Sequence, residues 1–358
     1  MTALLGYITH SHKMANILYG VNGEGSGHST RSKEVIRHLM GKGHAVHVVS
    51  FDRGLRNLSA DFDVTEIYGL RFAYVKNQVR YRKTVAKNLI TVPSAARSLK
   101  KLSHLAEQWK IGLVCTDFEP VSYRVGHHLG LPIISIDNQH ALTHARLEYP
   151  KHHRAEAVTA KLVTRLLIPH ATEYLITAFF RAPVKGKRAY LLPPILRQEV
   201  LDTKPSDRGF TLVYVTSPSD ELAAMLKRVR HPFICYGFNR EGKDANLTFK
   251  SPSLAGFLRD LAACHAVVAN SGFSLICEAL QLGKPYLAIP VRHQFEQVLN
   301  AYYVDKKAYG AYWEELTKER VESFLFNVDL FRKNLAHYPR QDNTALFTKL
   351  DQLIAKHV

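Results

Sequence analysis

The fold of this chain is indicated most clearly by one stretch, Asn270–Pro290, which reads NSGFSLICEALQLGKPYLAIP. An apolar strand ends at its start, Ser271-Gly272 form a tight turn, and a helix and a second strand follow. The turn leaves unpaired backbone N–H groups at the helix N-terminus, where the helix dipole also favours negative charge. The sequence therefore predicts a phosphate-binding helix terminus made by Ser271, Gly272, Phe273 and Ser274.

A carboxylate one helical turn further on extends this prediction. Glu278 lies close enough in sequence to stand beside a ligand on the helix terminus. Acidic residues in nucleotide sites accept hydrogen bonds from ribose, so the pair of features indicates a nucleoside diphosphate. The alternative is a buried strand–helix–strand unit with a glycine turn and nothing bound.

The overall composition limits the size of the protein, its partners and its compartment. The chain has 358 residues, is 46% hydrophobic and carries a net charge of +17, enough for two domains and typical of a protein with anionic partners. Its four cysteines form no close pair, which favours a reducing compartment, a cytoplasmic location and no metal site. No apolar run approaches the ~20 residues of a membrane span. Residues 1–13 are a poor signal peptide, and Met14 could be the native start.

Positive charge gathers in residues 71–101, which contain no Asp or Glu and interleave basic with apolar and aromatic side chains. This pattern predicts a peripheral contact with an anionic membrane face. A nucleic-acid-binding protein is an alternative that the charge alone would allow, although no recognisable nucleic-acid module appears.

Strands and helices alternate along the chain, which predicts an α/β fold with parallel sheets. The expected divisions are an N-terminal domain at 1–192, a proline-rich linker at 193–209, a C-terminal domain at 210–340 and a final helix at 341–358. The expected strands are 16–21, 45–50, 64–68, 113–116, 133–137, 174–178, 211–215, 233–236, 247–250 and 266–269. The expected helices are 30–40, 91–109, 120–129, 155–167, 219–229, 254–263, those from 317 onward, and a last one at 343–356.

Together with Pro290 and the following Gln294-Phe-Glu-Gln297 and Asn300-Ala301, the opening stretch resembles the donor-binding motif of GT-B glycosyltransferases. The likeness is to the lipid-linked N-acetylglucosamine transferase of peptidoglycan synthesis and to the UDP-glycosyltransferases. The resemblance implies two Rossmann-like domains facing a cleft, with a C-terminal helix that packs back on the N-terminal domain. It also implies that Glu296 and Gln297 bind the donor sugar, and that neither cofactor nor metal is needed.

A glycine loop after the first strand reads GVNGEGSGHSTR, residues 20–31. Its spacing is not that of a dinucleotide fold and it lacks the lysine of a P-loop. It resembles the N-terminal glycine loop of GT-B enzymes, which implies an acceptor site at Gly25, Gly27 and Arg31. By the same likeness His28 is the base that takes a proton from the acceptor hydroxyl. The plain alternative for His28 is a capping or packing role.

Two further strand ends carry candidate residues. Asp117 could orient His28, as in the His–Asp pair of plant and animal UDP-glycosyltransferases. Glu119 could do the same or could itself act as the base. Capping of the helix that begins at Pro120 is an equal alternative. Asp137, Asn138 and His140 could contact the acceptor or form a polar loop.

Three donor contacts in the second half rest on the resemblance. Ser217 occupies the place of a glycine-rich diphosphate loop, but could merely cap a helix. Phe257 and Leu258 match the stretch that pairs with the nucleobase, and apolar packing would explain them equally well.

The sequence thus predicts an inverting, metal-independent glycosyltransferase that moves a sugar from a nucleoside-diphosphate sugar, UDP-linked by resemblance, to a hydroxyl acceptor. The acceptor would be a glycan, a lipid-linked molecule of cell-envelope synthesis or a small molecule, and the enzyme would lie in the cytoplasm or on the inner membrane face. A UDP-N-acetylglucosamine 2-epimerase of the same fold, a nucleic-acid-binding protein and a silent sugar-nucleotide sensor are the alternatives.

Overall fold

The computed structural model describes residues 14–358 except for 70–73, 76–77, 80–91, 217 and 252. Ser217, the leader at 1–13 and most of the basic segment at 71–101 therefore lie outside the described residues. Among the helices that are described, none is long and apolar enough to cross a membrane. All four cysteines are free and buried.

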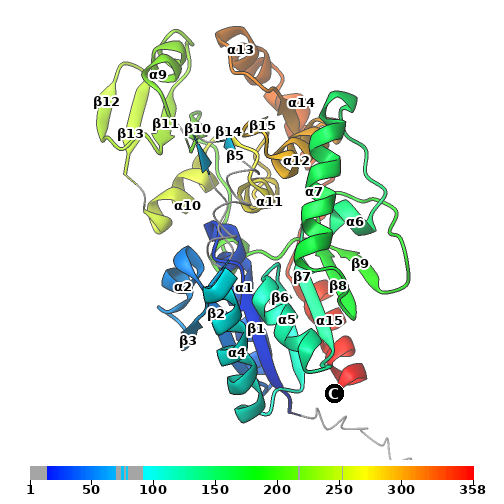
Figure 1. The fold of residues 1–358 in the computed structure, drawn as a ribbon. Coiled ribbons are helices and arrows are strands. Elements are labelled where there is room, and N and C mark those ends of the chain that lie inside the picture. The colour runs from blue at the N-terminus through cyan, green and yellow to red at the C-terminus, as the bar shows by residue number, and fades with distance from the viewer. Residues whose placement is uncertain (1–13, 70–73, 76–77, 80–91, 217, 252) are drawn as a thin grey trace, which may run out of the picture.

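The first half of the chain alternates strands and helices as the apolar periodicity predicts (Figure 1). The elements are β1 Asn16–Val21, α1 Ser26–Gly41, β2 Ala45–Ser50, α2 Asp52–Leu58, β3 Val64–Glu66, β4 Tyr74–Val75, β5 Gln78–Val79, α4 Val92–Gln108, β6 Leu113–Asp117, α5 Pro120–His128, β7 Ile133–Asp137, α6 Ala141–His144, η1 Lys151–His153, α7 Arg154–Leu167, β8 Glu173–Thr177 and β9 Ala189–Leu192.

The second half repeats the alternation and ends in three helices. The elements are α8 Gln198–Leu201, β10 Thr211–Tyr214, α9 Asp220–Lys227, β11 Phe233–Tyr236, β12 Gly242–Asp244, β13 Leu247–Lys250, α10 Leu254–Ala263, β14 Ala266–Asn270, α11 Phe273–Gln281, β15 Tyr286–Ile289, α12 Phe295–Lys306, β16 Gly310–Tyr312, α13 Lys318–Phe326, α14 Val328–Leu335 and α15 Thr344–His357.

Two sheets of seven strands result, ordered β3-β2-β1-β6-β7-β8-β9 and β12-β13-β11-β10-β14-β15-β16. All pairings within them are parallel except β12 with β13. In each sheet the strand order reverses once, between β1 and β6 and between β10 and β14. Ligands of such sheets bind beyond the carboxyl ends of the strands at that reversal. The fold is therefore the predicted pair of Rossmann-like domains, and it places both predicted glycine turns where ligands bind.

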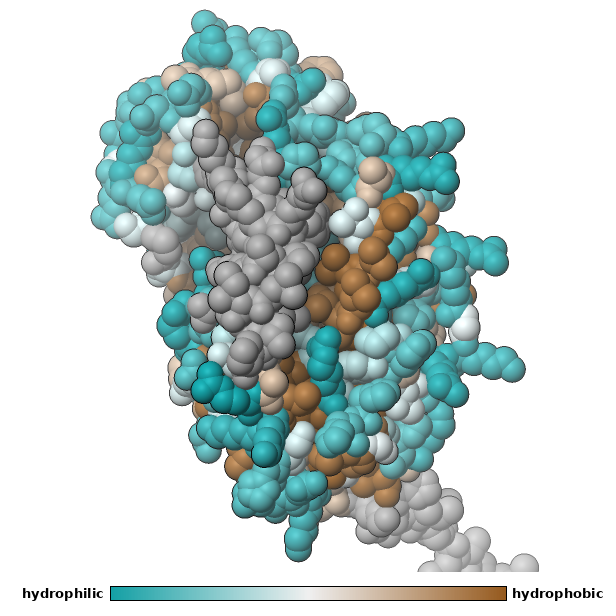
Figure 2. Space-filling model, in the orientation of Figure 1, coloured by the Kyte–Doolittle hydropathy of each residue, from teal (hydrophilic) through white to brown (hydrophobic). Residues whose placement is uncertain are grey.

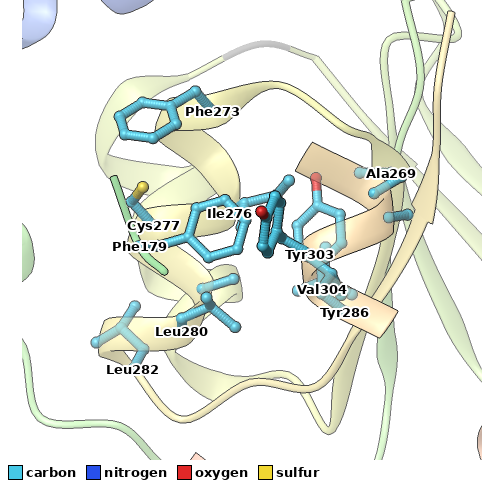
Figure 3. Packing of buried hydrophobic residues seen from close by; sticks show 14 of the residues in the cluster. Phe179, Ala269, Phe273, Ile276, Cys277, Leu280, Leu282, Tyr286, Tyr303 and Val304 are labelled. Carbon is cyan, nitrogen blue, oxygen red and sulfur yellow. The ribbon is translucent and has the colours of Figure 1, made fainter. Parts of the chain in front are cut away.

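The central strands are buried on both faces, which is why they read as continuous apolar runs. In the second domain α11 packs its apolar side against β14, β15 and α12, as Figure 3 shows for Ile276, Leu280 and Tyr303. Phe179, which follows β8, joins the same cluster. Phe180 stacks on Tyr303 with ring centroids 3.6 Å apart. The core of the second domain therefore includes residues from the end of the first.

The last helix returns to the first domain, as predicted. Leu346, Leu350, Leu353 and Ile354 recur at helical spacing and pack in the cluster that contains Ile17 and other residues of β1. The side chain of Asn343 fixes the start of α15, because its amide exchanges two hydrogen bonds with the backbone of Leu196, at 2.9 and 2.7 Å. The C-terminal helix α15 therefore packs against the N-terminal domain (Figure 1).

The main difference from the sequence prediction is the start of α1, which begins at Ser26 and not near Thr30. Gly25 caps this helix with φ +83° and ψ 167°, a region that residues with a Cβ avoid. The glycines of the loop thus allow a sharp turn straight into the helix, and His28 lies within its first turn. The short elements α2, α6, α8, β9, β12 and β16 were not predicted either, because three- to seven-residue segments carry too little periodicity.

Candidate active site

A cavity of about 360 Å³ lies between the two domains. Its walls come from the loops after β1, β6, β7 and β14, from the middle of α7 and from the start of α12. Residues of both predicted loops line it, among them Gly25, His28, Gly272 and Phe273. The strand reversals of the two sheets therefore open on one shared cavity, the arrangement that the sequence predicted as a cleft.

Three helices begin at this cavity, and none has a side-chain cap. The N-cap residues are Gly25 for α1, Gly272 for α11 and Gln294 for α12. The tips of α1 and α11 lie close together, since a Cβ added to Gly27 would be 2.7 Å from the Ser274 hydroxyl oxygen. Uncapped helix termini present free N–H groups and the positive ends of their dipoles, so the cavity suits an anion.

The turn before α11 also contains an unpartnered hydroxyl. The Ser271 side chain is fully buried, and within the described part of the chain its oxygen has no hydrogen-bond partner. The turn itself is held in place from outside: the Asn300 amide donates to the Ser271 carbonyl at 3.0 Å, and the Asn270 side chain accepts from the backbone of Thr216 at 2.8 Å. Ser271 itself does not line the cavity, and its hydroxyl is one of seven buried side-chain atoms without a partner among the described residues, so its contact with a phosphate stays a prediction.

His28 and Asp117 meet at the other side of the cavity. Asp117 is the last residue of β6, and its carboxylate Oδ1 lies 2.7 Å from Nδ1 of His28. The aspartate is fully buried, whereas the histidine lines the cavity. Nδ1 of His28 also lies 2.8 Å from Nη2 of Arg31, which can only donate, so Asp117 and Arg31 compete for this nitrogen. With its proton on Nδ1 and directed at Asp117, a neutral ring would carry on Nε2 the lone pair that a general base requires.

Arg31 supports the Asp117 carboxylate. Its guanidinium donates to both carboxylate oxygens, at 2.7 and 2.5 Å, and Ser32 adds a hydrogen bond at 3.0 Å. Burial acts to raise the pKa of Asp117, but the charges of Arg31 and His28 outweigh it and hold that pKa below its ordinary value. Asp117 therefore stays ionised beside His28. Arg31 is itself buried and engaged here, and it does not line the cavity where its predicted acceptor contact would lie.

A chain of hydrogen bonds continues from Arg31 into the second domain. Arg31 donates to Asn138 at 2.9 Å, and Asn138 donates to the carboxylate of Glu296 at 2.6 Å. Gln139 donates to the other oxygen of Glu296 at 3.3 Å. Glu296, predicted to bind the donor sugar, is thus linked through Asn138 to Arg31, which holds Asp117 beside the predicted base.

The comparisons with known proteins agree with this geometry. The sequence model of glycosyl transferase family 1 matches residues 15–329, most of the chain. The chain belongs to glycosyl transferase family 1.

Solved structures of glycosyltransferases superpose over almost the whole length of both partners. The kitacinnamycin glycotransferase matches with a TM-score of 0.72 at 14% identity, covering 97% of this chain and 100% of the other. UGT2 of Phytolacca americana, in complex with UDP-2fluoro-glucose and pterostilbene, gives 0.67 at 14% identity, with coverages of 96% and 99%.

The MurG protein of Acinetobacter baumannii gives a TM-score of 0.59 at 14% identity, with coverages of 95% and 99%. These likenesses show the GT-B fold. No protein in the curated collection of sequences matches the chain. As a GT-B glycosyltransferase, it acts on a nucleotide-sugar donor and an acceptor.

The structure separates the two carboxylates that the sequence left as equal candidates. Glu119 is the N-cap of α5, and its carboxylate oxygens accept from the backbone of Val121 at 2.9 Å and of Ser122 at 2.6 Å. It is completely buried, and burial raises its pKa. In this glycosyltransferase Glu119 thus has the capping interaction, and Asp117 has the contact with histidine.

Asp137 and His140, predicted acceptor contacts, form a second His–Asp pair away from solvent. Their side chains are each 1% exposed and lie 2.7 Å apart, with the Ser135 hydroxyl donating to Asp137 at 2.6 Å. Burial opposes ionisation of Asp137, yet His140 and Ser135 together lower its pKa to about 2. The pair therefore stabilises the loop after β7, the polar-loop alternative, and does not reach the cavity.

Glu278 lies on α11, where its predicted partner is a ribose. In the structure its two carboxylate oxygens accept from the guanidinium of Arg197, at 2.8 and 2.9 Å, and both residues are buried. Burial raises the pKa of Glu278 against the effect of Arg197. A ribose would have to share this carboxylate with Arg197, so the ribose contact stays a prediction.

The remaining donor candidates surround the cavity or lie beyond it. Gln297 lines the cavity, but its side chain accepts from Val291 N at 3.0 Å and donates to Gln294 at 2.6 Å. Phe257 packs against the rings of Tyr214 and Tyr236, and Leu258 is buried. Their contact with a nucleobase is neither supported nor opposed by this packing.

Sequence reasoning missed the wall contributed by α7 and the bridge made by two amides. Ala160, Val163 and Thr164 line the cavity, and their spacing, one helical turn, marks a single face of α7. Asn138 and Gln139 follow β7 directly, and the strand-end argument that selects Asp137 also selects Asn138, as an acceptor contact, but not Gln139. Nothing in the sequence shows that they meet Glu296, which lies 158 residues from Asn138.

Proposed function

We propose that this glycosyltransferase moves a sugar with inversion from a nucleoside-diphosphate sugar to a hydroxyl group, in the cavity between α1 and α11. The observation that carries the proposal is the pairing of two features across one cavity. On one side an imidazole is held by a buried carboxylate; on the other an uncapped helix terminus carries an unpartnered buried hydroxyl.

Proton transfer falls to His28 in this mechanism. Its Nε2 takes the proton of the acceptor hydroxyl as the oxygen attacks the anomeric carbon from the face opposite the diphosphate. Asp117 keeps the ring in the required tautomer and stabilises the imidazolium that forms. The bond between the anomeric carbon and the diphosphate oxygen breaks with its electrons on the diphosphate, so the configuration of the sugar inverts.

The diphosphate leaves on the tip of α11. The free amides of Phe273 and Ser274 and the Ser271 hydroxyl are suited to donate to its oxygens, and the helix dipole favours the charge that develops there. These fixed donors would take the place of a metal ion at the reaction centre. Glu296, held by Asn138 and Gln139, would then accept from hydroxyls of the sugar.

Donor specificity is tested by mixing the chain with a panel of UDP-, GDP-, dTDP- and ADP-sugars and measuring thermal shift and release of the nucleoside diphosphate. We expect one nucleotide class, UDP on the strength of the family resemblance, to shift the melting temperature. Each nucleotide sugar is tested at a concentration that would saturate a known GT-B enzyme. If none of the four classes binds, the proposal is contradicted.

The 2-epimerase alternative predicts a different product from the same experiment. With UDP-N-acetylglucosamine and no acceptor, an epimerase would yield free UDP and N-acetylmannosamine. A silent sensor would bind the nucleotide sugar and release nothing with any acceptor. We expect release that depends on an added acceptor and on His28, which distinguishes the transferase from both alternatives.

We further propose that the enzyme rests on an anionic membrane, so that a lipid-linked acceptor can reach the cavity. On α7 the side chains of Val158, Leu162 and Leu166 are 58%, 55% and 64% exposed and form one stripe. Figure 2 shows the corresponding hydrophobic band on the surface. Arg165 and Lys161 flank the stripe, and the neighbouring face of α7 lines the cavity. This combination is typical of a helix that lies in a membrane interface.

Flotation with vesicles that contain anionic lipid tests this placement. The chain is expected to float at low salt and less at high salt, and Leu162→Glu with Leu166→Glu is expected to abolish flotation. Leu330→Glu is a matched control, because Leu330 is 55% exposed on α14 in the other domain. Flotation that survives the α7 changes, or none at low salt, would rule out this surface.

A further inference from the structure

A cluster of imidazoles and carboxylates lies where the start of α7 meets the second domain, apart from the catalytic cavity. Nε2 of His152 and Nε2 of His153 lie 2.9 and 3.1 Å from the same oxygen of Glu314. The histidines belong to η1, and Glu314 follows β16. Ligand atoms of the three residues all lie within 4.8 Å of one another. Side chains that are more than 160 residues apart in the sequence thus converge on one point.

The contacts of His153 are unusual for a histidine that only makes hydrogen bonds. Its Nδ1 lies 2.7 Å from a carboxylate oxygen of Glu156, while its Nε2 faces the carboxylate of Glu314. A neutral imidazole has one N–H, so it cannot donate to both carboxylates. A second proton on His153 would satisfy both carboxylates, and so would a cation held by Nε2 and Glu314. The Tyr312 hydroxyl donates to the same oxygen of Glu314 at 3.0 Å.

The arrangement has the ligand chemistry of a zinc site. Zinc prefers imidazole nitrogen and carboxylate oxygen in a tetrahedral set, often two histidines, one carboxylate and water. A ligating histidine usually donates its other ring N–H to a carboxylate, as His153 does to Glu156. His152 is 65% exposed on its side chain, so it is free to adjust its position around an ion.

We propose that His152, His153 and Glu314 bind a divalent transition-metal ion of the Zn²⁺ class, with Glu156 orienting His153. The ion would join η1 and α7 to the loop after β16. Next to it opens a cavity of about 570 Å³, lined by Glu156 and His293 among others, through which water and the ion can enter. A carboxylate oxygen of Glu156 also lies 3.0 Å from Nδ1 of His293, a residue in the loop just before α12.

This position gives the ion a structural consequence. One face of α7 and the start of α12 are walls of the catalytic cavity, and the two helices lie side by side (Figure 1). An ion bound at the N-terminal end of α7 would fix the distance between α7 and α12 without entering the catalytic cavity. The ion takes no part in the transfer step, so the proposal stands independently of the function proposed above.

Metal binding to the full chain, freed of tags and stripped of metal, tests this site directly. On addition of Co²⁺ we expect the visible absorption band of a tetrahedral ion, saturating at one ion per chain, and on addition of Zn²⁺ a rise in melting temperature. His152→Ala with His153→Ala is expected to abolish both signals. His127→Ala with His128→Ala is the matched control, because these adjacent histidines are exposed on α5 and leave the cluster intact.

Two single changes keep the test sound if the double variant folds poorly. Glu314→Gln removes an exposed ligand with little change in shape and should also eliminate the Co²⁺ band. Glu156→Gln should weaken Zn²⁺ binding by about 10–100-fold, the usual effect of losing the partner of a ligating histidine. Absence of the band in the parent chain, or a band unchanged in Glu314→Gln, would overturn the proposal and leave the cluster as an ion-pair network.

Discussion

The tips of α1 and α11 lie close together at one cavity and are built differently. Each follows a strand at the reversal of its sheet, and each has a glycine N-cap without a side-chain cap. The first turn of α1 carries His28, and Arg31 and Asp117 stand behind it. The first turn of α11 carries no charged residue, and the buried hydroxyl of Ser271, in the loop just before it, lacks a partner among the described residues. The same kind of helix start thus carries an imidazole in α1 and, in our proposal, binds an anion in α11.

The largest effect on the rate of transfer is expected from removing the His28 imidazole at the tip of α1. His28→Ala should lower kcat by about 10²–10⁴-fold, the usual contribution of a positioned general base. Binding of the nucleoside diphosphate at the α11 tip should be unchanged. His128→Ala, on the exposed end of α5, is the control. Transfer by His28→Ala at the parental rate would show that the base lies elsewhere.

The α11 tip can be changed so that stability and binding move in opposite directions. Gly272 has φ −66° and ψ 132°, and a Cβ there would meet nothing within 4 Å. Gly272→Asp and Gly272→Asn should both cap the helix and keep or raise the melting temperature. Only the aspartate should repel the diphosphate, weakening its binding by about 100-fold if the interaction is worth ~3 kcal/mol in this partly buried site.

The comparison between these two variants isolates charge from shape. Calorimetry with the nucleoside diphosphate that binds the parent chain measures both affinities, and thermal melts measure both stabilities. Equal affinities for Gly272→Asp and Gly272→Asn would mean that no anion sits on α11.

Ser271→Ala probes the same tip more gently. Because the hydroxyl has no partner within the described residues, its loss should leave the melting temperature of the free protein unchanged or slightly higher. Binding of the nucleoside diphosphate should weaken by about tenfold, the value of a hydrogen bond to a charged group. A clear loss of stability without any change in affinity would indicate a structural role for the hydroxyl.

The second His–Asp pair is an internal control for the first, because both lie in the N-terminal domain. Asp137 and His140 repeat the contact of Asp117 and His28, but away from the cavity. Asp137→Asn should therefore reduce stability and leave kcat unchanged. Because the pKa of Asp137 is lowered to about 2 in the folded state, its contribution of about 2 kcal/mol is present above pH 4 and is lost as the pH falls through 2.

Chemical denaturation between pH 7 and pH 2 measures this prediction. The variant should show a flatter dependence of the unfolding free energy on pH than the parent below pH 4. Parallel curves for the two proteins would mean that Asp137 is not held ionised by His140 and Ser135.

The parts of the site that could be predicted from the sequence are local ones. The turn at Ser271-Gly272 and the glycine loop before His28 each lie between a strand and a helix, so their place at a sheet reversal follows from the alternation of elements. The contact of His28 with Asp117 is one of two equal alternatives, because the sequence places both residues near the ends of neighbouring strands but does not separate Asp117 from Glu119.

The parts that could not be predicted depend on contacts between distant residues. Arg31 reads as an acceptor contact until Asp117 and Asn138 are seen to occupy its guanidinium. Glu278 reads as a ribose ligand until Arg197, from the linker, is seen beside it. The convergence of His152 and His153 on Glu314 joins residues more than 160 positions apart, and neither segment alone indicates a metal.

The central claim is that the diphosphate rests on α11 and faces His28. A crystal structure of the chain with the tightest-binding nucleoside diphosphate of the four tested would decide it. The account predicts phosphate oxygens within hydrogen-bond distance of the Ser271 hydroxyl and the amides of Phe273 and Ser274, on the side of the cavity opposite Nε2 of His28. A diphosphate bound elsewhere, with Ser271 still unpartnered, would contradict it.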